Sequence, residues 1–95
     1  MIKHIVFINV PGRSESLKAE VKKRLLALPS QIECIRHLEV GLNFCSQERA
    51  YDVALVTEFD SKEDLATYDT HPAHQEFIAY VKSLPVETKA VDYEF

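Results

Sequence analysis

The spacing of apolar residues most constrains the fold of this chain, because it alternates between the period of a strand and the period of a helix. Along the sequence the two periods follow the order β-α-β-β-α-β, with prolines or short polar segments between the elements. The pattern predicts strands over residues 3–10, 35–44, 52–59 and 86–95, and helices from Ser14 or Ser16 to residue 28, over 61–68 and over 72–84. The second helical section is therefore expected in two pieces.

The first helix is expected to be amphipathic. Its predicted buried stripe consists of Leu17, Val21, Leu25 and Leu28, and the predicted solvated face carries Lys18, Lys22 and Lys23. Pro29 should end this helix, and a serine should cap its start.

The second helical section begins with Ser61, a near match to a capping box. Pro72 suits the first position of the next helix, where its missing N–H costs nothing. His74 then shares the buried stripe of that helix with Phe77 and Val81, so its imidazole should point toward the sheet. His71 should lie at the rim as a helix cap.

This element order predicts an α+β, ferredoxin-like fold, in which a four-stranded antiparallel sheet has helices on one face only. The other face would then expose Ile5 and Phe7 of the first strand and half of the residues of the third and fourth strands. Such a face is too apolar to be left in water. We therefore expect a homodimer in which two copies pack through their sheet faces.

Composition excludes several functions. The 95 residues suffice for one domain, and 11 basic against 15 acidic residues give a net charge of −4, which offers no attraction to nucleic acid or to an anionic membrane. The longest apolar run, Ile5-Val6-Phe7-Ile8, is too short to span a bilayer and begins too near Met1 for a secretory signal. We expect a cytoplasmic protein in which Cys34 and Cys45 stay reduced.

One segment contains side chains that could catalyse proton transfer: Tyr68-Asp-Thr-His71-Pro72-Ala73-His74. Imidazole titrates near neutral pH, and the phenol of Tyr68 lies close to the two histidines in the sequence. A zinc site formed by His4, His71 and His74 is a competing use of these residues. No carboxylate or thiolate has a spacing that would fix a fourth ligand, so we expect no metal there.

The sequence resembles the stress-responsive A/B barrel (Dabb) domain family, part of the dimeric α+β barrel superfamily. Five segments carry the resemblance: Ile2-Lys3-His4-Ile5-Val6; Val40-Gly41-Leu42-Asn43; Tyr51-Asp52-Val53-Ala54-Leu55-Val56 with Glu58-Phe59-Asp60-Ser61; Tyr68 with His71-Pro72-Ala73-His74; and Val91-Asp92-Tyr93. The resemblance implies that residues 1–95 form a single Dabb domain. It also implies a dimer with a closed barrel of two sheets, and a pocket between helices and sheet in each subunit.

The resemblance further implies site residues. One enzyme of the family is a plant polyketide cyclase. Its pocket is lined by a histidine of the first strand and by the tyrosine and the last histidine of a Tyr-x-x-His-Pro-x-His motif. The corresponding residues here are His4, Tyr68 and His74. Such cyclases use no cofactor and catalyse an aldol condensation. His74 would act as the base, Tyr68 as its partner or the oxyanion donor, and His4 would orient groups in the pocket. The cyclase also has a tyrosine on its first helix, whereas residues 24–27 here offer no hydroxyl.

Three functions remain open. The pocket of a stress-responsive dimer could bind a small hydrophobic or aromatic molecule without converting it. Alternatively, His74 and Tyr68 could serve a cyclase-like lyase or a cofactor-independent oxygenase. The third is a purely structural dimer. Loss of turnover in His74→Ala and Tyr68→Phe would indicate the enzyme, whereas no ligand should shift the melting temperature of a structural dimer.

Overall fold

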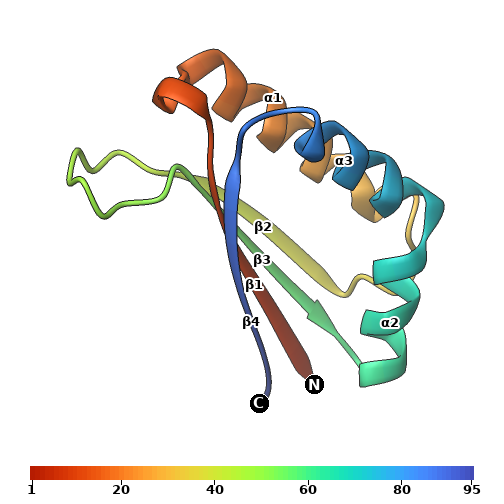
Figure 1. Ribbon diagram of the computed structural model, residues 1–95. Helices are drawn as coiled ribbons and strands as arrows, with labels where there is room; N and C mark the ends of the chain where they lie inside the picture. The colour runs from red at the N-terminus through yellow and green to blue at the C-terminus, as the bar shows by residue number, and fades with distance from the viewer.

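The computed structural model describes residues 1–95 and has the expected order of elements (Figure 1). They are β1 (Ile2–Asn9), α1 (Glu15–Leu26), β2 (His37–Leu42), β3 (Val53–Phe59), α2 (Lys62–Thr70), α3 (Pro72–Lys82) and β4 (Glu87–Glu94). Two short 3-10 turns, η1 (Pro11–Arg13) and η2 (Leu28–Ser30), flank α1. The longest helix, α1, has 12 residues, and none of the helices combines the length and the apolar character that crossing a membrane requires.

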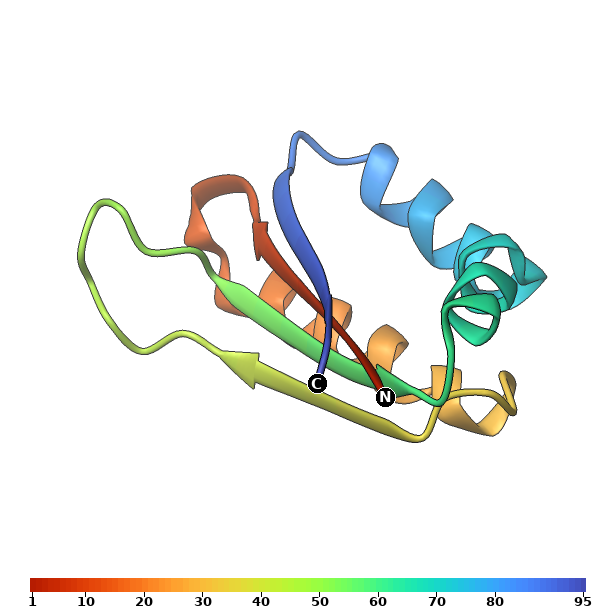
Figure 2. The same ribbon diagram turned by 90° about the horizontal axis from the view of Figure 1, so that it is seen from below.

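The four strands form one sheet in the order β2-β3-β1-β4, and each neighbouring pair is antiparallel. All helices lie on one face of this sheet (Figures 1 and 2). This is the ferredoxin-like α+β arrangement, so the predicted fold is confirmed. The core between the two layers includes the fully buried side chains of Val21 and Leu25 on α1, Phe59 on β3 and Tyr68 on α2.

The strand register assigns residues to the two faces of the sheet. Ile5 lies between Val56 of β3 and Val91 of β4 on the face away from the helices, which we call the outer face. Phe7 and Val91 on this face are 45% and 53% exposed. The expected apolar and uncovered sheet face is therefore present.

The helices begin where the sequence predicted. The Ser14 hydroxyl accepts a hydrogen bond from the Leu17 N–H at 3.2 Å, which decides between the two candidate serines. Ser61 caps α2 in the same way by accepting from the Asp64 N–H at 3.1 Å. Pro72 is the first residue of α3.

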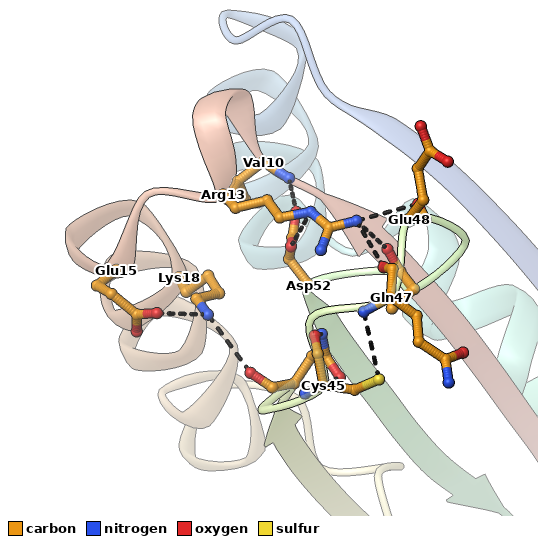
Figure 3. Close-up of polar contacts among 10 residues, drawn as sticks. Val10, Arg13, Glu15, Lys18, Cys45, Gln47, Glu48 and Asp52 are labelled. Atoms are coloured by element: carbon orange, nitrogen blue, oxygen red, sulfur yellow. Dashed lines mark hydrogen bonds and ion pairs between the residues drawn. The ribbon is translucent and has the colours of Figure 1, made fainter.

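The prediction that Lys18 lies on a solvated helix face was wrong. Lys18 is only 6% exposed, because it lies next to Leu17 and one turn before Val21 on the side of α1 that meets the protein. Its ammonium donates to the Asn43 carbonyl at 3.4 Å and pairs with the Glu15 carboxylate at 2.8 Å (Figure 3). The long aliphatic stem is buried while the charged end reaches polar partners.

The connection between β2 and β3 is longer than the short polar turn expected. It covers residues 43–52, and Phe44, which the sequence pattern placed at the end of a strand, lies beyond β2 and is fully exposed. Two groups of hydrogen bonds join this connection to the segment between β1 and α1 (Figure 3). The Arg13 guanidinium donates to the carbonyls of Gln47, Glu48 and Ala50, and the buried Asp52 carboxylate accepts from the Val10 N–H at 2.8 Å.

Candidate functional site

The three site residues expected from the resemblance lie together between the helices and the sheet. His4 comes from β1, Tyr68 from the last turns of α2 and His74 from the first turn of α3. The ring centroids of Tyr68 and His74 are 4.2 Å apart, and those of His4 and Tyr68 are 5.9 Å apart. Tyr68 is fully buried, and both histidines are 9% exposed. His74 thus points inward, as its position on the α3 stripe predicted.

These three side chains line a cavity of about 230 Å³, which we call the first cavity. Most of its wall is apolar and consists of Val6, Ile8, Leu55, Phe77, Ile78 and Val81. Its volume exceeds that of a cavity of ~150 Å³ that holds benzene, and it falls below the ~300 Å³ at which pockets for drug-sized molecules begin. The first cavity therefore has room for one substituted ring.

The Tyr68 hydroxyl is a hydrogen-bond donor that the protein does not use. It is buried and has no hydrogen-bond partner. Burial, and secondarily the nearby Asp69 carboxylate, raise the pKa of Tyr68 above its ordinary value, because both disfavour the phenolate. At neutral pH Tyr68 therefore keeps its proton and remains a hydrogen-bond donor.

His74 is held in one tautomer by the end of α2. Its Nδ1 lies 3.0 Å from the Asp69 carbonyl oxygen, and a carbonyl can only accept, so Nδ1 carries the proton. In the neutral imidazole the other ring nitrogen, Nε2, then has a free lone pair. Gln75 donates to the same carbonyl oxygen at 2.6 Å. This arrangement gives His74 the form that a general base requires.

His4 has a partner that the sequence did not reveal as part of the site. Its Nδ1 donates a hydrogen bond to Asp92 Oδ1, because His4 on β1 and Asp92 on β4 lie directly opposite each other in the strand register. Asp92 was recognised only as part of the Val91-Asp92-Tyr93 segment. The carboxylate fixes the orientation of the imidazole, as second partners of functional histidines commonly do.

His71 does not join the cluster. Its Nδ1 accepts a hydrogen bond from the Ala73 N–H at 3.0 Å, so it caps α3 as predicted. No three histidine, cysteine, aspartate or glutamate side chains are grouped so that they could hold a metal ion. The geometry thus gives no support to the alternative of a zinc site at His4, His71 and His74.

Known proteins share this chain's sequence and fold. An uncharacterized protein of Streptomyces coelicolor is 34% identical over the full length of both chains. A dimeric protein of unknown function with a ferredoxin-like fold, from Bacteroides fragilis, is 34% identical with a TM-score of 0.83, covering 99% of this chain and 95% of that one. A hydroxynitrile lyase from Passiflora edulis is only 15% identical, with a TM-score of 0.81 over 97% of this chain and 90% of that one, and shares the fold alone.

The sequence pattern that defines the Stress responsive A/B Barrel Domain matches residues 2–95. That range contains every strand and helix of the fold and all residues of the first cavity. The chain belongs to the stress-responsive A/B barrel (Dabb) domain family.

Proposed function

We propose that the first cavity binds a small aromatic or otherwise hydrophobic molecule that carries a hydrogen-bond acceptor, and that this is the function of a cytoplasmic, stress-responsive protein. The buried, unpartnered hydroxyl of Tyr68 in a mostly apolar wall carries the proposal. An unpartnered polar group in such a place lowers stability, and a ligand oxygen that accepts its hydrogen bond would remove that cost.

Two probes of nearly the same shape test this proposal. Acetophenone carries a carbonyl oxygen, whereas cumene replaces it with a methyl group. We expect acetophenone to bind about 2- to 12-fold more tightly, which corresponds to one net hydrogen bond of ~0.5–1.5 kcal/mol. Amide resonances of the cavity wall should shift in NMR spectra. In Tyr68→Phe both probes should still bind, but acetophenone should lose its advantage, because its carbonyl oxygen is then buried without a donor. Equal affinities in the unaltered protein, or no shifts at the cavity wall, would contradict the proposal.

A second candidate function is proton transfer without a cofactor, of the kind that a cyclase or lyase needs. The tautomer of His74 favours it, because Nε2 is free to accept a proton while Nδ1 is bonded to the Asp69 carbonyl. Nε2 would take a proton from a carbon next to a carbonyl group, the electron pair would move to the carbonyl oxygen, and Tyr68 would donate a hydrogen bond to the resulting enolate. His4, held by Asp92, would orient the ligand.

Deuterium exchange distinguishes this candidate from simple binding. Acetophenone in D2O exchanges its methyl protons through the enolate, and NMR follows the loss of their signal. A catalyst should accelerate the exchange, and His74→Ala should abolish the acceleration while the protein stays folded. An exchange rate that equals the rate in buffer would leave binding as the function of the cavity.

We also propose that two copies pair through the outer face. Ile5, Val56 and Val91 form an apolar row across three strands there, and exposed Phe7 and Tyr93 extend it. The Bacteroides fragilis relative is described as dimeric. Light scattering at micromolar concentration should give twice the chain mass of 10.9 kDa, and a value for the single chain would contradict this assembly.

A further inference from the structure

A second cavity, of about 450 Å³, lies near the two chain termini, between α2 and the ends of β1 and β4. We call it the second compartment; it is lined by Ile2, Lys62, Leu65, Asp92, Tyr93 and Glu94. The end of the sheet where the termini lie is also the end that α2 covers (Figure 1). Of its lining residues only Asp92 forms a side-chain hydrogen bond with a residue of the first cavity, namely His4.

The strand register joins the second compartment to the first cavity. Opposite pairs along β1 and β4 run from Ile2–Glu94, in the second compartment, through His4–Asp92 to Val6–Ala90, in the first cavity. These pairs share one face of the sheet, and successive pairs are ~6.6 Å apart.

The second compartment and the first cavity also follow each other along helix α2. Leu65 lines the second compartment, and Tyr68, one turn further along, lines the first cavity. The two spaces therefore lie next to each other along the same two strands and along α2, and the hydrogen-bonded His4–Asp92 pair lies between them.

The chemistry of the two parts differs. The first cavity is mostly apolar, whereas half of the residues that line the second compartment are charged. Lys62 pairs with Glu94 at 3.5 Å, but both side chains are largely exposed, so the pair is weak. Asp92 Oδ1 accepts the hydrogen bond from His4, and Asp92 Oδ2 has no partner within the protein. The second compartment thus has two carboxylates, of Asp92 and Glu94, and one ammonium group, of Lys62. This excess of negative charge favours the binding of a hydrogen-bond donor or a cation there.

We propose that the second compartment receives the polar end of an elongated ligand whose aromatic head occupies the first cavity. The tail ends in an ammonium or hydroxyl group, which donates to Asp92 Oδ2, and not in a carboxylate. This inference rests on the proposed binding function of the first cavity. It adds the shape of the ligand and the charge of its end.

A panel of four probes tests the inference. Each is acetophenone with a four-carbon chain in the para position, ending in methyl, hydroxyl, ammonium or carboxylate. We expect the ammonium probe to bind roughly tenfold more tightly than the carboxylate probe, since one end is attracted and the other repelled by the same two carboxylates. NMR should show amide shifts at Leu65 and Glu94 for the ammonium and hydroxyl probes, and none there for unsubstituted acetophenone.

A matched pair of variants controls the charge effect. Glu94→Gln should reduce the ratio of ammonium to carboxylate affinity about threefold. Glu87→Gln makes the same change at the opposite end of β4, outside the compartment, and should leave the ratio unaltered. Both residues are exposed, so folding should not be affected.

Two results would overturn the inference without affecting the first cavity. In one, all four probes shift only residues of the first cavity; in the other, the carboxylate probe binds as tightly as the ammonium probe. If unsubstituted acetophenone shifts no residue of the first cavity, the proposed function itself fails, and the inference fails with it.

Discussion

Replacing Tyr68 by phenylalanine should stabilise the protein, although Tyr68 lies at the centre of the site. The ring packs against Phe59 and His74, with centroid distances of 5.1 Å and 4.2 Å, and phenylalanine can keep both contacts. Only the hydroxyl is lost, and it is buried without a partner. Burying an unpartnered hydroxyl costs ~1–3 kcal/mol. We expect the free energy of unfolding to rise by about 1–2 kcal/mol.

Urea unfolding followed by circular dichroism measures this change. The midpoint should rise in Tyr68→Phe while the slope with denaturant stays constant. In thermal unfolding, each 1 kcal/mol should raise the melting temperature by ~4–8 °C for a domain of this size. Protein concentration must be equal in all samples, because an associated chain gains stability from its partner. Tyr51→Phe is the control, since Tyr51 is only partly buried and lies near Phe7 on the outer face. Its change should stay within ~0.5 kcal/mol.

A loss of stability in Tyr68→Phe would refute the reasoning. It would mean that the hydroxyl has a partner in the folded protein, so no donor would be left for a ligand. The expected result is instead a variant that is more stable and has lost its preference for acetophenone over cumene. The same hydroxyl then lowers the stability of the free protein and raises its affinity for ligands with an acceptor.

Three further predictions concern pH, the connection between β2 and β3, and assembly. The pKa of Tyr68 is raised in the folded protein, so below pH 10.0, its ordinary pKa, the folded and the unfolded protein both keep the phenolic proton. Above that pH only the unfolded protein loses this proton. The free energy of unfolding should therefore fall with rising pH, by at most ~1.4 kcal/mol per pH unit. Tyr68→Phe should remove that part of the slope, and identical slopes would contradict the prediction. Asp52→Asn weakens the buried hydrogen bond from the Val10 N–H and removes the charge 3.8 Å from Arg13, so the urea midpoint should drop by the equivalent of about 1–2 kcal/mol; an unchanged midpoint would show that the contact contributes little. Val91→Lys places a charge in the apolar row of the outer face and should halve the mass measured by light scattering, whereas Glu87→Lys at the end of β4 should not; a dimeric Val91→Lys protein would show that the copies pair elsewhere.

The sequence allowed the order of elements and the inward direction of His74 to be predicted, because both depend on local patterns. Ser61 and Pro72 mark helix starts through their own hydrogen-bonding properties, which hold wherever such residues occur. His74 could be assigned to the inner face because its distance from Phe77 and Val81 follows the helical period.

Three features could not be predicted, and each depends on contacts between residues far apart in the sequence. The pairing of His4 with Asp92 requires the register between the first and the last strand, which no local pattern sets. The burial of Lys18 depends on the Asn43 carbonyl in the connection between β2 and β3. The connection that leaves Phe44 outside β2 is held by hydrogen bonds from Arg13 to the carbonyls of Gln47, Glu48 and Ala50.

The break between α2 and α3 prepares His74 for its role. In a continuous helix the Ala73 N–H would donate to the Asp69 carbonyl, four residues earlier. Here the Ala73 N–H donates to the His71 side chain instead, and Pro72 has no N–H to offer the preceding turn. The Asp69 carbonyl is therefore left free, and it accepts from the His74 imidazole at 3.0 Å. His71 and Pro72 line neither cavity. They nevertheless free the Asp69 carbonyl to bind His74 Nδ1, and this leaves Nε2 as the acceptor. The segment from Tyr68 to His74 thus acts as one unit, in which the cap residues His71 and Pro72 determine the tautomer of His74.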